Sequence, residues 1–299
     1  MIGELAALGA AICWTASAVL YKRALQKTKP VSANVVRLTS TGGILLLVLV
    51  AAGKFGVLTS LPLNAAVLAS VSGIVGLGLG DTLYMASLKL VGVARAVPIT
   101  CTYPLFNILW ATLIVGENVS SWAFIGAAAI LSGIWLIAHE EEPDQTEIQT
   151  KTLAKGVILA LATAVMWSIS ITMINMVVTL PQSNRFDYAL AVNAIRVAAI
   201  AVVLLASAPI IDRHHGFLKM ERKTLILLIV GGMVALALGW FLLTVGLQNA
   251  PESRAVPISS TTPLFSTLLA IVLLRERVTF RNALGSVIIV GGIFLIFVV

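Results

Sequence analysis

The sequence predicts an all-α membrane protein with ten transmembrane helices, arranged as two inverted five-helix repeats. Three observations carry this prediction: the apolar composition, the number of long apolar stretches and an internal repeat. Of the 299 residues, 59% are hydrophobic and 11% are charged, whereas a soluble domain carries about 25% charged residues. The mean hydropathy is +1.01. A soluble protein of this composition would expose large apolar patches, so we expect lipid to surround most of the surface.

The apolar stretches are long enough to cross a bilayer. A helix that spans the hydrocarbon core needs about 20 apolar residues, and helices are expected because every backbone polar group must be satisfied inside lipid. Ten spans are predicted at approximately 3–21, 33–52, 64–88, 94–115, 120–138, 154–177, 187–207, 224–247, 253–273 and 280–298. The polar stretch 139–153 reads as a solvated linker, which divides the chain into a first repeat at 1–138 and a second repeat at 154–299.

The internal repeat is visible in residues that lipid-facing composition does not explain. Arg95–Ile99 recurs as Arg254–Ile258 at an offset of 159, and 19 of 43 positions are identical when 95–137 is aligned with 254–296 without gaps. The identities include Arg, Pro, Glu and Gly in register. Because each copy has an odd number of spans, the second copy enters the membrane from the opposite side, as in inverted-repeat transporters. This arrangement suits alternating access.

The sequence resembles the EamA-type branch of the drug/metabolite transporter superfamily. The resemblance lies in Ala94–Glu117 and Ser121–Ile137, in their counterparts Arg254–Glu276 and Arg281–Ile296, and in Leu79–Leu90. It covers nearly the whole chain twice. It implies a ten-helix carrier of small organic metabolites, often an exporter of amino acids, and it leaves the substrate open.

Matched polar and aromatic side chains are the candidates for substrate binding. Thr100, Tyr103 and Asn107 share one face of a helix by their spacing, and their counterparts in the second copy are polar too. Hydrogen bonding between helices is an equally good explanation of these two stripes. Tyr21, which shares a face with Trp14, is better explained by an interfacial aromatic belt or by packing. The candidate substrate-binding residues are Trp14, Ser17, Asp81, Tyr84, Thr100, Tyr103, Asn107, Trp167, Ser170, Trp240, Ser259, Thr262 and Ser266.

Paired prolines in both copies are candidate hinges. Each proline removes a hydrogen bond to the carbonyl four residues earlier, and broken helices in membranes often mark sites and hinges. A static kink is the alternative. The candidate hinge residues are Pro98, Pro104, Pro257 and Pro263.

Three charged residues, Arg37, Asp81 and Arg196, lie inside predicted spans and away from the span ends. An ionisable residue inside the membrane is a functional candidate, so Asp81 is a candidate for proton coupling or for binding a cationic group. A structural pair with Arg37 is the alternative. The matched arginines could attract an anionic group, or their heads could snorkel to the lipid headgroups. Trp240 occupies the position equivalent to Asp81.

The remaining features point to no cofactor. There is no metal-binding spacing and no nucleophile–base set in the sequence, so we expect no metal, no cofactor and no enzyme activity. Cys13 and Cys101 read as packing residues, and Gly76–Gly80 reads as a site of close helix packing. We expect a monomer whose partners are the lipid bilayer and a small-molecule substrate, with no nucleic acid. A polytopic membrane enzyme and a channel are the alternatives.

The charges predict the orientation in the cell membrane. With ten spans, fifteen of the 20 Lys and Arg residues lie on one face, whereas the opposite face holds Lys54, Arg185 and Arg254. The positive-inside rule places the basic face in the cytoplasm and both termini outside. The family resemblance suggests cytoplasmic termini for many members, and the charge count decides our expectation.

Overall fold

The computed structural model describes residues 1–110, 121–138, 150–178, 186–212, 216–250, 252–274 and 278–298, and all regular structure within these ranges is helical. The first half contains α1 (Ile2–Leu25), α2 (Pro30–Ala51), α3 (Phe55–Thr59), α4 (Leu63–Ser72), the π-helical segment η1 (Gly73–Gly80), α5 (Asp81–Val91), α6 (Val93–Thr100), α7 (Tyr103–Trp110) and α8 (Ser121–Ala138). The second half contains α9 (Thr150–Val178), α10 (Phe186–Ile211), α11 (Arg222–Gly232), the π-helical η3 (Met233–Gly239), α12 (Trp240–Asn249), α13 (Glu252–Ser259), α14 (Thr262–Leu269), the π-helical η4 (Ala270–Leu274) and α15 (Phe280–Val298).

Within the described ranges, six helical stretches are long and apolar enough to cross a membrane. They are Ile2–Leu25, Pro30–Ala51, Leu63–Val91, Lys151–Val178, Phe186–Ile211 and Arg222–Asn249. Ile125–Ile137 and Phe280–Leu295 are shorter apolar helices. The spans predicted near 94–115 and 253–273 are each divided into shorter helices, α6 with α7 and α13 with α14. The prediction of an all-helical, multi-pass membrane protein is therefore confirmed.

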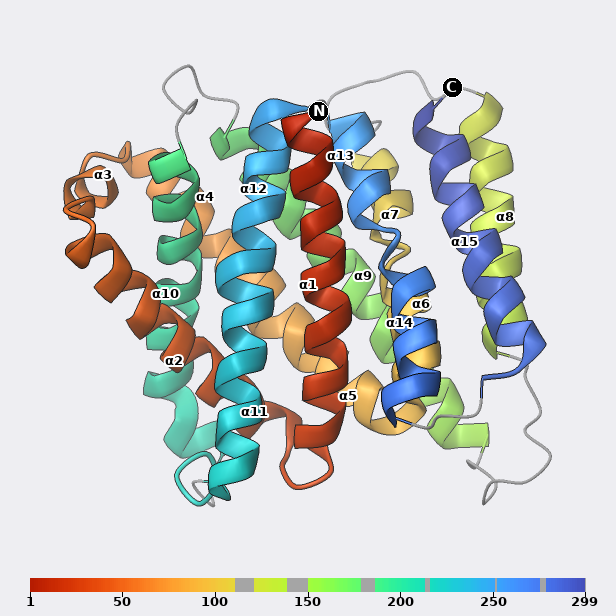
Figure 1. Ribbon diagram of the computed structural model, residues 1–299, viewed down its shortest axis with the longest axis horizontal. Coiled ribbons are helices and arrows are strands. Elements are labelled where there is room, and N and C mark those ends of the chain that lie inside the picture. The colour runs from red at the N-terminus through yellow and green to blue at the C-terminus, as the bar shows by residue number, and fades with distance from the viewer. Residues whose placement is uncertain are drawn as a thin grey trace.

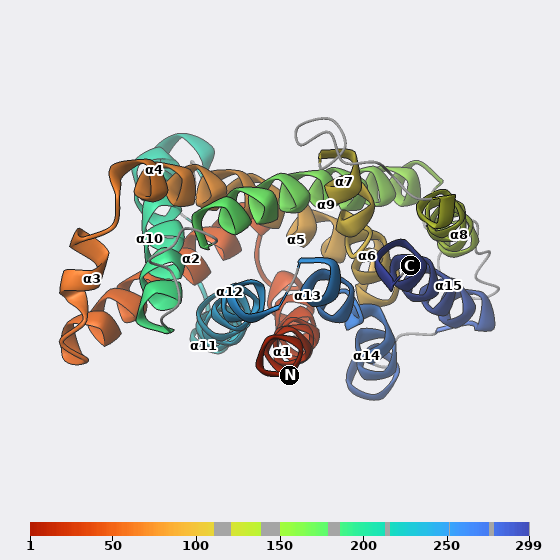
Figure 2. The same cartoon turned by 90° about the horizontal axis from the view of Figure 1, so that it is seen from above.

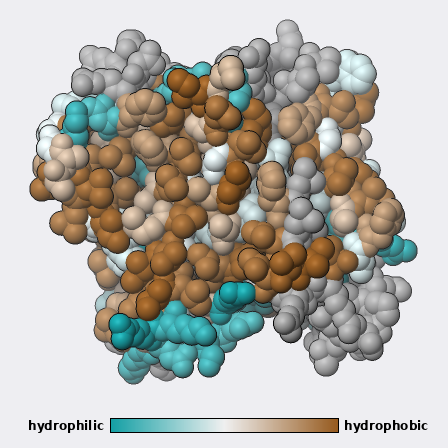
Figure 3. All heavy atoms as spheres, in the orientation of Figure 1, coloured by the Kyte–Doolittle hydropathy of each residue, from teal (hydrophilic) through white to brown (hydrophobic). Residues whose placement is uncertain are grey.

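The surface has the polarity that a bilayer requires. Figure 3 shows a broad apolar belt, with hydrophilic side chains gathered at the edge where α1 ends and α11 begins. Large side chains in the belt are strongly exposed, including Leu47 (68%), Ile210 (72%) and Val272 (71%). Lipid rather than water explains such exposure.

The first helix of each half packs with the other half. Viewed from above, α1 lies in one row with α11, α12, α13 and α14, whereas α9 lies in the opposite row with α4, α5, α6 and α7 (Figure 2). The pairs α2–α10 and α8–α15 stand at the two ends of these rows. The two halves are therefore crossed, and the centre of the molecule is built from both.

The helices α1 and α9 run in opposite directions. Lys22 Nζ near the end of α1 donates to the Leu88 carbonyl at 2.8 Å, and Ser87 Oγ donates to the carbonyl of Gly156 near the start of α9 at 2.9 Å. The last turns of α1 and the first turns of α9 therefore meet α5 at the same edge. Figure 1 shows both chain termini at the other edge.

The two π-helical segments in the third span of each half are held in the same way. A π-helical turn widens the helix and leaves carbonyls without their usual partners. Asn34 Nδ2 donates to the carbonyls of Leu77 and Gly78 at 3.0 and 3.2 Å. At an offset of 159, Asn193 Nδ2 donates to the carbonyls of Leu236 and Ala237 at 2.8 and 3.3 Å. One buried asparagine on α2 or α10 thus supports the widened turn of its own half.

Glycines permit the closest contacts between the crossed halves. A Cβ at Gly73 would lie 2.2 Å from the Arg196 carbonyl oxygen, and one at the equivalent Gly232 would lie 3.0 Å from the Arg37 carbonyl oxygen. Real Cβ atoms do not approach so closely to backbone, so a side chain at either glycine would push the helices apart. These contacts bring both arginines to the centre of the molecule.

Candidate functional site

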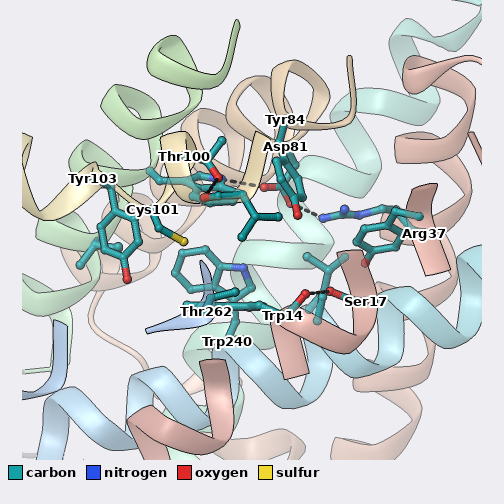
Figure 4. Close-up of a pocket in the computed structure, with 16 residues that line it drawn as sticks. Trp14, Ser17, Arg37, Asp81, Tyr84, Thr100, Cys101, Tyr103, Trp240 and Thr262 are labelled. Atoms are coloured by element: carbon teal, nitrogen blue, oxygen red, sulfur yellow. Dashed lines mark hydrogen bonds and ion pairs between the residues drawn. The ribbon is translucent and has the colours of Figure 1, made fainter. Parts of the chain in front are cut away.

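A cavity lies at the centre of the molecule, where the two rows of helices face each other. Side chains from both halves line it, and Figure 4 shows them converging on a common space. The lining residues are Trp14, Ser17, Tyr21, Arg37, Asp81, Tyr84, Val97, Thr100, Cys101, Tyr103, Trp167, Ile171, Ala235, Leu236, Trp240 and Thr262.

The cavity is small in this conformation. Its volume is about 40 Å³, and one water molecule needs about 10–15 Å³ on such a measure. The space suits a few water molecules rather than an organic solute. A solute therefore requires the lining helices to move apart.

One wall of the cavity carries a buried ion pair. Arg37 Nη2 donates to Asp81 Oδ2, and the other carboxylate oxygen of Asp81 accepts from Trp167 Nε1 at 2.7 Å. Both charged side chains are almost fully buried. The Arg37 guanidinium also lies over the Tyr21 ring, 4.6 Å from its centroid, a geometry that favours a cation–π interaction. Asp81 is thus held by two helices of the first half and by α9 of the second.

Aromatic side chains form much of the remaining wall. The rings of Trp14 and Trp240 meet edge to face at a centroid distance of 5.3 Å. Trp167 contacts Tyr84 at 5.1 Å and Tyr103 at 6.3 Å between centroids. Such walls suit an apolar or aromatic body with a few polar groups, as small-molecule sites commonly do.

Glycines position the two tryptophans that cross between the halves. A Cβ at Gly80 would lie 3.0 Å from Trp167 Cδ1, and one at Gly239 would lie 2.8 Å from Trp14 Nε1. These two glycines are equivalent in the repeat, and each marks the end of a π-helical segment. Each half therefore receives the tryptophan of the other half against its own third span.

The breaks in the fourth span of each half also meet at the cavity. In the first half, α6 ends at Thr100 and α7 begins at Tyr103; in the second half, α13 ends at Ser259 and α14 begins at Thr262. The Tyr103 hydroxyl and the Ser259 hydroxyl share a hydrogen bond of 2.7 Å. The two predicted breaks are thus joined across the halves. Pro98 lies inside α6, and the other prolines of the hinge prediction fall in α7, α13 and α14.

The structure brings together most of the candidate residues. Those that border the cavity are Trp14, Ser17, Asp81, Tyr84, Thr100, Tyr103, Trp167, Trp240 and Thr262, together with the charged residue Arg37. Ser170, Ser259, Asn107, Ser266 and Arg196 are buried but do not border the cavity in this conformation. Ser170 and Ser259 lie directly behind it, hydrogen-bonded to Ser72 and Tyr103 respectively.

Tyr21 and Cys101 line the cavity but are not among the candidates predicted from sequence. Of the two explanations for Tyr21, an interfacial belt or a packing aromatic, the structure fits packing, because Tyr21 is 1% exposed and its hydroxyl donates to the Gly231 carbonyl at 2.7 Å. Its spacing from Trp14 and Ser17 places it on their face, and that periodicity could have indicated the cavity. Cys101 was interpreted as a packing residue, and it is buried at the cavity wall.

Polar contacts join α2 and α10 at both of their ends. Lys54, just after α2, pairs with Asp187 at the start of α10 at 3.3 Å. At the other edge, Ser32 Oγ donates to Asp212 Oδ2 at 2.8 Å, and the Phe217 backbone N–H donates to the same oxygen at 3.1 Å. Burial raises the pKa of the Asp212 carboxyl, but these hydrogen bonds, with Lys29 nearby, hold it below its usual range. The helices α2 and α10 are thus fastened together as one unit.

The site has no metal-binding character in the part of the chain that is described. Within those residues, no group of three or more His, Cys, Asp or Glu side chains is placed to hold a metal ion. The groups that line the cavity are aromatic and aliphatic side chains, hydroxyls, one thiol and one ion pair. Such groups can bind a small molecule.

Comparison with known proteins gives the family. The model of the EamA-like transporter family matches residues 1–139 and 154–298. An uncharacterized transporter of Archaeoglobus fulgidus is 27% identical over 298 residues, covering 99% of this chain and 98% of that protein. A crystal structure shares the fold at 20% identity, with a TM-score of 0.68 over 98% of this chain and 95% of that one. The chain therefore belongs to the EamA-like transporter family of the drug/metabolite transporter superfamily and is a multi-pass membrane transporter.

Proposed function

We propose that this chain is a secondary carrier that exports small organic metabolites, such as amino acids, by alternating access through the central cavity. The observation that carries the proposal is the construction of the cavity. Its walls come from the crossed halves, with α1 seated against the second half and α9 against the first. A change in the angle between the halves would therefore open the cavity toward one side as it closes toward the other.

The repeat supports this mechanism. We infer ten spans in two inverted units, 1–138 and 154–299. The opposite directions of α1 and α9 and the equivalent roles of Asn34 and Asn193 support this inference. In such a pair, each half can adopt the conformation of the other, which exchanges an outward-open for an inward-open state. The present conformation, with a cavity of about 40 Å³, corresponds to a state between these two.

The distribution of positive charges supports one orientation of the chain in the membrane. Lys27, in the loop after α1, and Arg222 and Lys223, in the first turn of α11, lie at the edge opposite both termini. The positive-inside rule places this edge in the cytoplasm and both termini outside the cell membrane. We infer that the carrier works as a monomer, because the cavity is complete within one chain.

Asp81 is the proposed site of proton coupling. It is a buried carboxylate at the cavity wall whose charge is balanced by Arg37. Protonation would release Arg37 and loosen a contact between α2 and α5. A pH gradient could then drive the exchange between the two open states.

Transport by purified protein in liposomes tests the proposal. Uptake of labelled amino acids, organic acids, amines and nucleosides is measured with and without a pH gradient. We expect saturable uptake of one chemical class and acceleration when the unlabelled solute is present on the other side. Asp81→Asn should remove the response to the gradient. Absence of saturable uptake for every class would contradict the carrier proposal, and conductance without saturation would indicate a channel.

A further inference from the structure

Two arginines occupy equivalent positions at the centre of the molecule, but their surroundings differ. Arg37 on α2 and Arg196 on α10 are separated by the repeat offset of 159 and are 1% and 0% exposed. Arg37 pairs with Asp81. The residue of the second half equivalent to Asp81 is Trp240, and the guanidinium of Arg196 lies over its ring, 4.3 Å from the centroid. One arginine thus has a carboxylate where the other has an indole.

The other contacts of Arg196 are with neutral groups. Its Nε donates to Ser72 Oγ at 3.1 Å, and its Nη2 donates to Ser170 Oγ at 3.2 Å. Its Nη1 is buried and has no hydrogen-bond partner among the described residues. No carboxylate in the described part of the chain lies within ion-pair distance of it. A guanidinium offers five N–H donors in a fork that matches a carboxylate, and here part of that fork is unused.

Among the described residues, the two central arginines therefore have one carboxylate between them. Asp81 offsets one arginine, and its two oxygens are already engaged by Arg37 and Trp167. A buried charge without a counter-ion is costly in a medium of low dielectric. Since Ser72 and Ser170 do not supply the missing negative charge, an anion from outside the chain would supply it.

The cavity lies next to this arginine. Trp240 and Ile171 both border the cavity. Trp240 carries the guanidinium on its ring, and Ile171 follows directly after Ser170, which contacts Nη2. A rotation of the Trp240 side chain would expose the unused donors of Arg196 to a molecule in the cavity. Trp240 is the first residue after the π-helical η3, where the backbone geometry changes.

We propose that Arg196 binds the carboxylate group of the transported solute and that the Trp240 ring covers this arginine when the site is empty. The proposal rests on the carrier function proposed above and narrows its substrates to molecules that bear a carboxylate. The apolar part of the solute lies against the aromatic walls formed by Trp14, Trp167 and Tyr103. The carboxylate of the solute thus balances the charge of Arg196, as Asp81 balances the charge of Arg37 in the first half.

Matched sets of three solutes test the proposal on purified protein. One set is 3-phenylpropanoate, phenylalanine and phenethylamine, and a second is 4-methylpentanoate, leucine and 3-methylbutylamine. Within each set the apolar part of the amino acid is kept, while either its carboxylate or its amine is removed. The readouts are the increase in unfolding temperature with solute concentration and the saturable uptake into liposomes.

We expect a carboxylate-bearing member of at least one set to stabilise the wild-type protein, and the matched amine to have no effect. Arg196→Gln should weaken the apparent affinity for the acid on the order of tenfold to a hundredfold, as expected for a charge-assisted hydrogen bond. Lys223→Gln, which removes an exposed cation from the first turn of α11, is the matched control and should bind like wild type. Arg196→Lys keeps the charge but not the fork, and it should bind the acid with intermediate affinity.

The outcomes separate this proposal from the carrier proposal. Transport of the amines with unchanged affinity in Arg196→Gln would overturn the carboxylate site and leave the carrier function standing. Stabilisation by an acid that depends on Arg196, without any transport, would support the site and contradict the carrier function. If Arg196→Gln does not fold, Arg196→Lys decides: affinity equal to wild type for acid and amine alike overturns the site. A wild-type protein that none of the acids or zwitterions stabilises also overturns it.

Discussion

The two halves of this transporter share a backbone plan and differ in charge at the point where they meet. Asn34 and Asn193 donate hydrogen bonds to equivalent π-helical turns. Gly73 and Gly232 pack closely against the backbone of the equivalent arginines Arg196 and Arg37. The first half, however, has a carboxylate beside its arginine, and the second half has Trp240. The features that shape and pack the helices are duplicated, and so are the two arginines, whereas the carboxylate beside Arg37 has no counterpart in the second half.

This difference teaches how a duplicated fold acquires a polar binding site. Both halves need the same bends and close contacts if they are to exchange conformations. The cavity, by contrast, needs groups that bind one solute in one orientation, and a symmetric set of charges would bind it in two. The first half contributes the pair of Arg37 with Asp81 to the cavity wall, and the second half contributes the Trp240 ring with Arg196 stacked on it, so the two contributions are chemically distinct.

The largest expected effect concerns the compensated arginine. Asp81→Ala removes the counter-ion of Arg37 and leaves a buried charge, which should lower the free energy of unfolding by about 3–5 kcal/mol. The double variant Arg37→Met/Asp81→Ala removes both charges and should recover much of this loss. Thermal unfolding in detergent measures the effect.

The second half provides the comparison. Arg196→Met leaves no carboxylate unpaired among its described partners, so it should cost less stability than Asp81→Ala or even increase stability. If Arg196→Met were the more destabilising of the two, the account of Arg196 as an uncompensated charge would be wrong.

The next effect concerns the crossing glycines. Gly73→Ala places a Cβ against backbone of α10 at 2.2 Å, and Gly232→Ala places one 2.6 Å from Thr41 Oγ1. The first contact is with backbone and cannot move aside, so Gly73→Ala should destabilise by about 1–3 kcal/mol and Gly232→Ala by less. Gly43→Ala is the control, because a Cβ there has nothing within 4 Å. It should be neutral or stabilise by up to about 1 kcal/mol through helix propensity. Equal losses of stability in all three variants would show that close helix packing at these glycines is not the cause of the destabilisation.

A smaller difference is expected between the two asparagines. Asn34 donates to two carbonyls and to Thr82 Oγ1, whereas Asn193 donates to two carbonyls alone. Each substitution by Ala should cost about 1–3 kcal/mol, because a buried carbonyl loses its donor. The cost at Asn34 should exceed that at Asn193 by roughly 0.5–1 kcal/mol. Hydrogen exchange of the η1 and η3 amides should locate the loosening in the same half as the substitution, and loosening of both halves equally would contradict independent support.

The smallest effect is a pH dependence at the edge of the molecule where α10 ends. The pKa of Asp212 lies below its usual range in the folded protein, mainly because hydrogen bonds from Ser32 and Phe217 outweigh the effect of burial. A depressed pKa contributes stability above the unfolded pKa of about 3.9, and this contribution is lost as the pH falls through the folded pKa. Asp212→Asn should therefore cost roughly 1 kcal/mol at pH 7 and progressively less below about pH 4. Unfolding curves of both proteins between pH 3 and 7 measure this, and a constant difference would contradict it.

Much of the fold follows from patterns that are local in the sequence. Apolar length predicted helices that cross the membrane, and the duplicated prolines predicted the interruptions at 101–102 and 260–261. The glycine run Gly76–Gly80 was explained by close packing, and Gly76 indeed faces Ser170 while Gly80 faces Trp167. Proline acts through the backbone at its own position, and a glycine run marks where another helix can approach closely, so both features can be recognised without knowing which helix is the neighbour.

The arrangement of the helices could not be predicted in the same way. In a membrane, apolar side chains face lipid and other helices alike, so periodicity does not say which helices are neighbours. The packing of α1 against the helices of the second half could therefore not be predicted from the sequence. Among the alternatives left open for Arg37, the structure selects the pair with Asp81 over snorkelling. Tyr21 was not among the candidates for the same reason, because a tyrosine near the end of a span is common at a membrane interface.

Access to Cys101 from the two sides of the membrane tests the central claim most directly. Cys13→Ala leaves Cys101 as the one thiol of the chain, and it lies buried at the wall of the cavity. A membrane-impermeant thiol reagent is applied to right-side-out and to inside-out vesicles, with and without transported solute. The account predicts that the reagent labels Cys101 from both sides and that the transported solute changes both labelling rates. The vesicles should show no ion conductance. Labelling from one side only, in a protein that still transports, would contradict alternating access through this cavity.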